Sequence, residues 1–252
     1  MDALFITDPW FYCTAIPAIL IFGIGKGGLG GALGIVAVPL MSLTIAPVQA
    51  AAIMLPILLL MDAFAVKHHY RSIDWQIVKQ MLPGMVIGVA AAGMFMLSFS
   101  EALIRVGIGL LCLYFSARYF LSYRRRDEEN AHLMATPWGF LSGFASTAIH
   151  AGGGPASIYF LSLKIDKVVL IASMAAFFAL TNVCKLVPFY LLGELEIANM
   201  ATALLLMPIA PIGVKMGVWL LHRCSNETVY TLCYSLLVLS GSNLFIDGVA
   251  AL

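Results

Sequence analysis

The feature that most constrains this chain is its succession of long apolar segments separated by short polar ones. Several approach the roughly 20 residues that an α-helix needs to cross a bilayer. Hydrophobic residues make up 62% of the 252 residues and charged residues 11%, too few to cover a soluble apolar core. The short alternating segments typical of a membrane β-barrel are absent. We therefore predict an all-α polytopic membrane protein. Its apolar segments lie at residues 9–24, 28–44, 47–66, 77–97, 102–121, 137–149, 153–163, 168–192, 198–221 and 228–249.

Charge and cysteine content exclude several function classes. The net charge is +1, so no overall field favours nucleic acid. The five cysteines lie mostly in or beside apolar segments and lack metal-ligand spacing, which favours a packing role. We predict no cofactor, no metal site and no nucleic-acid partner.

A polar stretch, SYRRRDEENAHLMATP, divides the chain into two halves. We predict a first membrane repeat at 1–121, a cytoplasmic linker at 122–136 and a second membrane repeat at 137–252. Each half begins with two shorter segments joined by glycines, GIGKGGLGGALG and STAIHAGGGPAS, and continues with three longer spans. Each repeat is therefore predicted to be a glycine-broken hairpin followed by three transmembrane helices.

Basic residues predict the orientation of these segments, because loops rich in Lys and Arg stay in the cytoplasm. Arg124–Arg126 place the linker in the cytoplasm, and the loop with Lys67 and Arg71 falls on the same side. Neither terminus carries a basic residue, so both are predicted to be periplasmic. Each half then crosses the membrane an odd number of times, and the two repeats have inverted topology.

Weak internal similarity accompanies this inversion. PLMSLTIAP resembles YFLSLKIDK at a shift of 120 residues, which sets Asp62 opposite Asn182. LPGMVIG resembles MPIAPIG further along the chain at a slightly larger shift. Inverted repeats with paired broken segments indicate where a transporter binds its substrate.

The motif G-K-G-G-L-G-G-x-L-G followed by P-L, the later H-A-G-G-G-P and the two-half layout resemble the sulfite exporter TauE/SafE family, also called the TSUP permeases. The similarity covers nearly the whole chain. It implies a transporter that moves sulfite, organosulfonates or related sulfur-containing anions across a bacterial inner membrane. The motifs are glycine patterns and do not specify the substrate.

The glycine hairpins allow two interpretations once nucleotide binding is excluded. GIGKGG formally matches G-x-G-x-x-G but lacks a preceding strand, and Gly27 stands where a P-loop needs Ser or Thr. Glycines four residues apart, such as Gly139 and Gly143, let helices approach closely. Alternatively, glycines break the helix so that the next half-helix aims its N–H groups at an anion. We favour this second role for the two tips together.

Lys26 and His150 lie at the predicted hairpin tips. Lys26 would be costly at membrane depth unless it met a carboxylate, a substrate anion or water, although it could also extend to a headgroup. His150 could donate to an oxyanion and titrate near neutral pH, or simply form a hydrogen bond in packing.

Two further polar residues lie within predicted spans. Asp62 could pair with a lysine or exchange a proton, or it could reach interfacial water from a helix end. Asn182, in a region that also contains Thr181 and Lys185, could bind substrate oxygens or join two helices. Weaker candidates of the same kind are Gln49, Ser146 and Thr147.

From these observations we predict an inner-membrane secondary transporter of a small sulfur-containing anion that works by alternating access. Proton coupling through Asp62 or His150 is a hypothesis, and the other expected partners are the lipid bilayer and, as an open alternative, a second copy in a homodimer. Competing hypotheses are an anion channel, a transporter of an unrelated small carboxylate, and an intramembrane enzyme, for which no nucleophile or metal-ligand pattern appears. The predicted substrate-binding residues are Lys26, Gly27, Gly28, His150, Gly152, Gly153 and Asn182.

Overall fold

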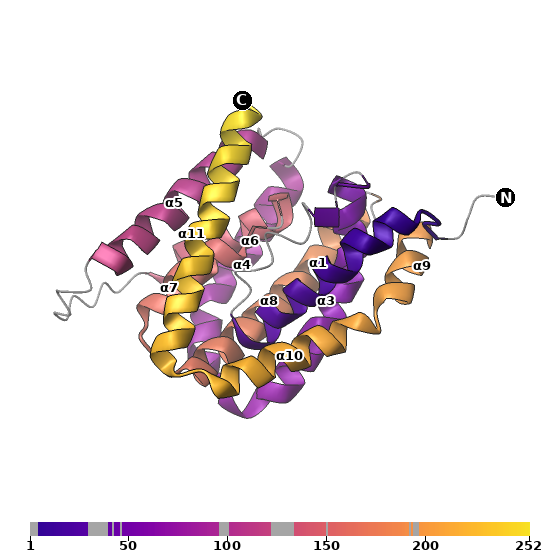
Figure 1. Cartoon of the computed structure of the whole chain (residues 1–252). Helices are drawn as coiled ribbons and strands as arrows, with labels where there is room; N and C mark the ends of the chain where they lie inside the picture. Colours follow the sequence, from indigo (N-terminus) through magenta and orange to yellow (C-terminus); the bar gives the residue numbers. More distant parts are fainter. Residues whose placement is uncertain are drawn as a thin grey trace.

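The computed structural model describes residues 5–29, 40–41, 43–45, 47–95, 101–121, 134–149, 151–191, 193 and 197–252. Within these ranges the chain is helical and contains no strand, which confirms the all-α prediction (Figure 1). A short 3₁₀ helix, η1, covers Tyr70–Ser72. The α-helices are α1 (Pro9–Gly28), α3 (Pro47–His69), α4 (Trp75–Phe95), α5 (Glu101–Leu121), α6 (Ala135–Ile149), α7 (Gly153–Ser162), α8 (Lys167–Leu191), α9 (Ile197–Leu206), α10 (Ile209–Arg223) and α11 (Asn226–Ala250).

The length and hydropathy of these helices make the chain a membrane protein. In the described part, five helical stretches are long and apolar enough to cross a bilayer, and the bent pair α9–α10 would make a sixth. Large apolar side chains such as Trp10 and Leu239 lie exposed on the outside of the bundle, as lipid contact requires. The five stretches are Pro9–Gly28, Gln49–Ser72, Trp75–Met94, Lys167–Leu191 and Asn226–Ala250.

Short polar residues fix where several helices begin. The Asp8 carboxylate accepts from the backbone N–H of Trp10 at 3.0 Å, and Pro9 follows it as the first residue of α1. The side chains of Asp74, Asp166 and Ser225 accept from the first turns of α4, α8 and α11 in the same way. Such caps satisfy backbone donors that the helix leaves unpaired.

One predicted span is broken. The sequence predicts a single segment at 198–221, but the chain bends by 47° between α9 and α10. Pro208 lies at this bend. Proline lacks the backbone N–H and clashes with the preceding turn, so it interrupts a helix.

The two glycine-rich segments differ from each other. The sequence predicts a break near residues 24–28, but α1 continues to Gly28 and includes Lys26 in its last turn. Residues 30–39, which would form the second arm, lie outside the described residues. In the second half, α6 ends at Ile149 and α7 begins at Gly153, close to the predicted positions. There the Ala151 N–H donates to the carbonyl of Ala145 at 3.0 Å.

Helices α1 and α10 come from opposite halves and pack closely through glycines. A Cβ at Gly23 would lie 2.8 Å from the Cα of Gly213, and a Cβ at Gly28 would overlap the carbonyl oxygen of Gly217. Because residue numbers rise together along this contact, the two helices run parallel. Small residues four apart on both helices allow this approach.

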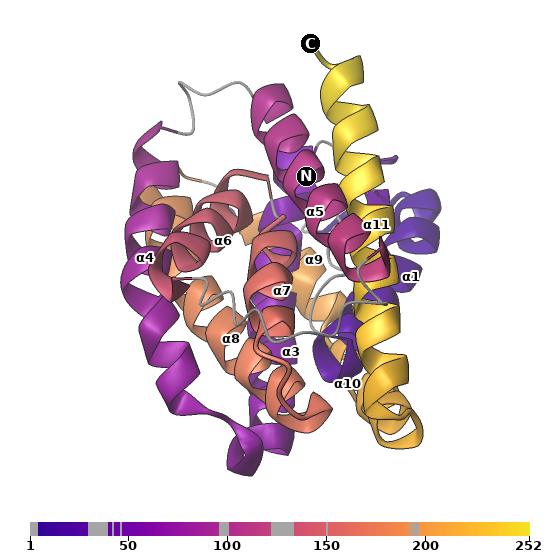
Figure 2. The same ribbon diagram turned by 90° about the vertical axis from the view of Figure 1, so that its left-hand side faces the viewer.

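Helices α4 and α6 form a second parallel pair across the halves (Figure 2). Added Cβ atoms at Gly84 and Gly88 would overlap carbonyls of α6, and those at Gly139 and Gly143 would overlap carbonyls of α4. The packing role that the sequence suggested for Gly139 and Gly143 is therefore confirmed.

Two antiparallel pairs also join the halves. In the pair α3 and α8, Leu55 packs in one cluster with Phe189. Asp62 comes after Leu55 in α3, and its partner Asn182 comes before Phe189 in α8, so the two helices run in opposite directions. Along α5 and α11, a Cβ at Gly109 would lie 2.8 Å from the Gly241 oxygen. Figures 1 and 2 both show α5 beside α11.

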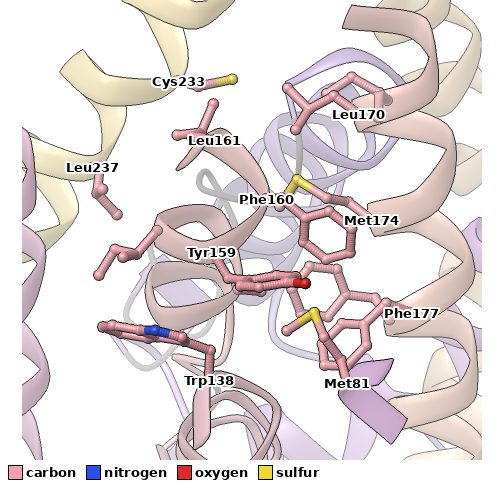
Figure 3. Close-up of a cluster of buried hydrophobic side chains, with 14 of the residues drawn as sticks. Met81, Trp138, Tyr159, Phe160, Leu161, Leu170, Met174, Phe177, Cys233 and Leu237 are labelled. Carbon is pink, nitrogen blue, oxygen red and sulfur yellow. The ribbon is translucent and has the colours of Figure 1, made fainter. Parts of the chain in front are cut away.

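The largest apolar cluster surrounds the short helix α7 (Figure 3). Tyr159, Phe160 and Leu161 of α7 pack against side chains from neighbouring helices, including Trp138 of α6 and Phe177 of α8. The Phe160 and Phe177 rings lie edge to face with centroids 6.1 Å apart. This cluster fixes α7 and the hairpin turn beside α8.

Candidate functional site

Three of the predicted residues meet inside the bundle. Lys26 of α1 forms an ion pair with the Oδ1 atom of Asp62 in α3. Asn182 of α8 donates its Nδ2 to the Oδ2 atom of the same carboxylate at 2.6 Å. The exposed fractions are 4% for Lys26, 2% for Asp62 and 3% for Asn182, so the group is shielded from solvent. We call these three residues the central triad.

The central triad explains how the charge of Lys26 is tolerated inside the bundle. A buried lysine needs a counter-charge, and Asp62 supplies it. The Lys26 ammonium also lies 5.0 Å from the ring centroid of Phe178 and 5.9 Å from that of Phe22. Such ring faces attract a cation in a desolvated site.

One face of α8 supplies much of the site. Phe178, Asn182, Lys185 and Phe189 follow one another at intervals of four, three and four residues, which places them on the same side of a helix. All four are buried. The face therefore presents an amide and an ammonium between two aromatic rings.

Lys185 belongs to the site, but sequence reasoning did not include it among the predicted binding residues. Its exposed fraction is 1%, and its Nζ lies 3.4 Å from the Oγ of Ser146 in α6. The Phe189 ring centroid lies 5.6 Å from the same Nζ. The spacing of three residues from Asn182 within one apolar span was the signal that could have identified it.

His69 is a second residue whose position the sequence did not indicate. It falls within the predicted cytoplasmic loop that contains Lys67 and Arg71, but the structure places it at the end of α3, where it is buried. Its Nε2 lies 3.1 Å from the carbonyl oxygen of Gly27, at the C-terminal end of α1. It lies seven residues after Asp62, which is two helical turns along the same face. His69 therefore contacts the end of the helix that carries Lys26.

Gly27 and Gly28 lie in the last turn of α1 and face α10. A Cβ at Gly27 would overlap the carbonyl of Val214, and one at Gly28 would overlap that of Gly217. Their N–H groups belong to a helical turn, and this helix end presents carbonyls instead. These contacts match the close-packing interpretation.

The second hairpin turn lies beside Ser142 and Ser146 of α6. Ser142 donates its hydroxyl to the carbonyl of Gly152 at 2.8 Å, and a Cβ at Gly152 would lie 2.6 Å from the Cβ of Ser146. Gly153 is the first residue of α7 and is buried. His150 lies outside the described residues.

The weaker candidates have separate partners. Gln49 donates to the Oδ1 of Asn199 at 3.2 Å, linking α3 to α9. Thr147 donates to the carbonyl of Gly143, and Thr181 to that of Phe177, each one turn earlier in its own helix. None of these bonds joins the central triad.

The site is a buried polar cluster in which one carboxylate, one amide and a hydroxyl lie near two ammonium groups. In the described part of the chain, no group of three His, Cys, Asp or Glu residues is arranged to hold a metal ion. Ammonium, amide and hydroxyl groups instead provide donors suited to an oxyanion.

Comparison with known proteins places the chain in a family. No curated protein and no solved structure matches it. The model of the family described as sulfite exporter TauE/SafE, however, matches residues 15–244, which is most of the sequence. Together with its apolar helices and its buried polar cluster, this match shows that the chain belongs to the sulfite exporter TauE/SafE family of membrane transporters.

Proposed function

We propose that the protein is a secondary transporter that moves a small sulfur-containing anion, sulfite or an organosulfonate, across a bacterial inner membrane by alternating access. The family supplies the class of substrate. The observation that carries the proposal is the central triad, because ionisable residues buried within membrane spans mark substrate and ion pathways.

The proposal includes an inverted-repeat architecture, which the directions of the helix pairs support. Each half begins with a helix, α1 or α6, that runs parallel to a later helix of the other half, α10 or α4. The α3–α8 and α5–α11 pairs are antiparallel. Exchanging the halves therefore reproduces the pattern of contacts, as expected for a two-fold axis in the membrane plane.

The bond between Asp62 and Asn182 supports a position for the proposed axis. The two residues are 120 apart, which is the shift at which the halves align. Asp62 lies fifteen residues after the start of α3, and Asn182 lies fifteen residues after the start of α8. Equivalent residues that touch must lie near the symmetry axis. The same shift relates Lys26 to Ser146, the partner of Lys185.

An orientation follows from the basic residues. We place the central linker in the cytoplasm and both termini in the periplasm, since Lys67, Arg71 and Arg223 would then share the cytoplasmic side. The parallel course of α1 and α10 is consistent with this arrangement, because both helices would enter from the periplasm and end inside.

Alternating access would use the helices that meet at the triad. Lys26, Asp62 and Asn182 lie on α1, α3 and α8, so movement of one repeat against the other changes their separation. Protonation of Asp62 would remove the counter-charge of Lys26 and make the site more positive, which favours binding of an anion. This gives proton coupling through Asp62 a physical basis.

A flux assay in proteoliposomes tests the proposal. Sulfite, sulfate, thiosulfate and two organosulfonates are supplied in turn, with and without a pH gradient. We expect saturable flux of at least one sulfur anion and a change of rate with the gradient. Non-saturable flux would indicate a channel, and chemically altered substrate would indicate an enzyme. If no sulfur anion moves while a small carboxylate does, the proposed substrate class is wrong.

A further inference from the structure

Lys185 and Lys26 differ in what balances their charge. Lys26 is paired with Asp62, whereas Lys185 makes no ion pair with any residue that the structure describes. The one hydrogen bond that it makes within the described residues goes to the neutral hydroxyl of Ser146, at the long distance of 3.4 Å. A lysine is almost never this deeply buried unless it is paired.

Asp62 forms its ion pair with Lys26 and none with Lys185. Its Oδ1 accepts from Lys26 and its Oδ2 accepts from Asn182. The described cluster therefore holds two ammonium groups and one carboxylate. With both lysines protonated, it lacks one negative charge.

The donors around Lys185 are arranged to receive that charge. An ammonium has three N–H groups, and the residues that the structure describes accept from only one of them. Ser146 accepts from Lys185 and makes no donor contact within the described residues, so its O–H is free to donate. The Phe189 ring covers another side of the ammonium, at 5.6 Å.

We propose that Lys185, assisted by Ser146, is the residue that binds the transported anion, and that the site selects monovalent oxyanions such as hydrogen sulfite or an alkanesulfonate. This rests on the proposed function and assigns its binding group. Lys26 then serves to hold Asp62 and the three helices together. A monovalent anion neutralises the cluster, whereas a dianion leaves one negative charge buried.

Methanesulfonate and sulfate test this rule, because both are tetrahedral oxyanions of similar size and they differ by one charge. Binding is measured as the shift in thermal unfolding of the purified protein in detergent, with gluconate as the only other anion. We expect methanesulfonate to stabilise the wild-type protein at lower concentration than sulfate does. Asp62→Asn removes one negative charge, and the preference should then move towards sulfate.

Replacement of Lys185 isolates the binding group. Lys185→Met should weaken methanesulfonate binding by about 10- to 100-fold, the amount expected for the loss of a charge-assisted hydrogen bond. Without anion this variant should unfold at no lower temperature than the wild type, since an uncompensated buried ammonium is removed. Lys185→Arg keeps the charge and should retain binding. Lys215→Met, on the exposed face of α10, is the matched control and should change nothing.

The outcomes separate the two proposals. Wild-type-like methanesulfonate binding by Lys185→Met would overturn the assignment of Lys185, while flux of a sulfur anion would still stand. Binding that depends on Lys185 without any flux in proteoliposomes would overturn the transporter and leave the binding site. Equal preference for methanesulfonate and sulfate in both the wild type and Asp62→Asn would overturn the charge rule. A wild-type protein that binds neither methanesulfonate nor sulfate would overturn both the assignment of Lys185 and the charge rule.

Discussion

Replacing Lys26 by methionine isolates the cost of burying Asp62 without its counter-ion. Methionine keeps an unbranched side chain of similar length, so the packing beside Phe178 and Phe22 is largely retained. Among the described residues, the Asp62 carboxylate would then keep the hydrogen bond from Asn182 at 2.6 Å. The change therefore tests electrostatics more than shape.

The magnitude follows from burial. Asp62 is 2% exposed, so water cannot replace the lost ammonium. Removing one partner of a buried ion pair costs about 3–5 kcal/mol. For a protein of this size we expect the unfolding temperature to fall by roughly 10 °C, at about 2–4 °C per kcal/mol. Asp62→Asn should cost a similar amount, because it leaves Lys26 without its partner.

The double variant Lys26→Met/Asp62→Asn completes a thermodynamic cycle. Both charges are gone, and an asparagine oxygen can still accept from Asn182. We expect the double variant to lose less than about 2 kcal/mol, far below the sum of the single losses. This non-additivity is the signature of the ion pair.

Thermal unfolding in detergent can be followed with a maleimide dye that becomes fluorescent when it reacts with a thiol. Cys112 and Cys233 are buried and would react on unfolding, whereas Cys13 is exposed and is replaced by serine to lower the background. Additive losses in the double variant would refute the reasoning, because they would mean that Lys26 and Asp62 do not interact in the folded protein.

Three further predictions concern packing and topology. Gly28→Ala should lower the unfolding temperature by several degrees, because the added Cβ overlaps α10 at a cost of about 1–3 kcal/mol. Gly107→Ala is the control, because a Cβ there meets open space and should be neutral. Equal losses in the two variants would contradict the packing argument. In a cysteine-free background, a membrane-impermeant maleimide added to intact cells should label Leu191→Cys and leave Tyr70→Cys unlabelled, and the reverse pattern would invert the orientation. His69→Ala should destabilise the protein by about 1–3 kcal/mol in the same thermal assay, because the buried Gly27 carbonyl loses its contact; an unchanged unfolding temperature would show that this contact is not needed.

Apolar segment length predicted much of the fold. The predicted bounds of the segments at 47–66, 102–121 and 168–192 lie within a few residues of α3, α5 and α8. The bend at Pro208 was missed because the apolar run continues through it and hydropathy does not register a lost backbone donor. The continuation of α1 to Gly28 was also missed. A glycine can break a helix or allow a neighbouring helix to pack closely. The helix that packs on the glycines of α1 is α10, which lies nearly 190 residues further along the chain, so the local sequence does not distinguish the two roles.

The site was predicted in part. Repeat alignment set Asp62 opposite Asn182, and the cost of burying a charge required a partner for Lys26. The ion pair with Asp62 confirms one of the partners considered. Lys185 was overlooked as a binding residue because it lies seven residues from the end of the predicted span at 168–192, where a lysine can equally extend to the interface. Only the packing of α6 against α7 and α8 reveals that Ser146 covers it.

The pairing of α1 with α10 has a consequence for biogenesis. The glycine face of α1 is synthesised about 190 residues before the glycines of α10 that cover it. At roughly 5–20 residues per second, this face waits about 10–40 s for its partner. Lys26 and Asp62, in contrast, are only 36 residues apart and both precede the central linker. The nascent first half can therefore neutralise its own buried charges in the membrane long before Asn182 leaves the ribosome.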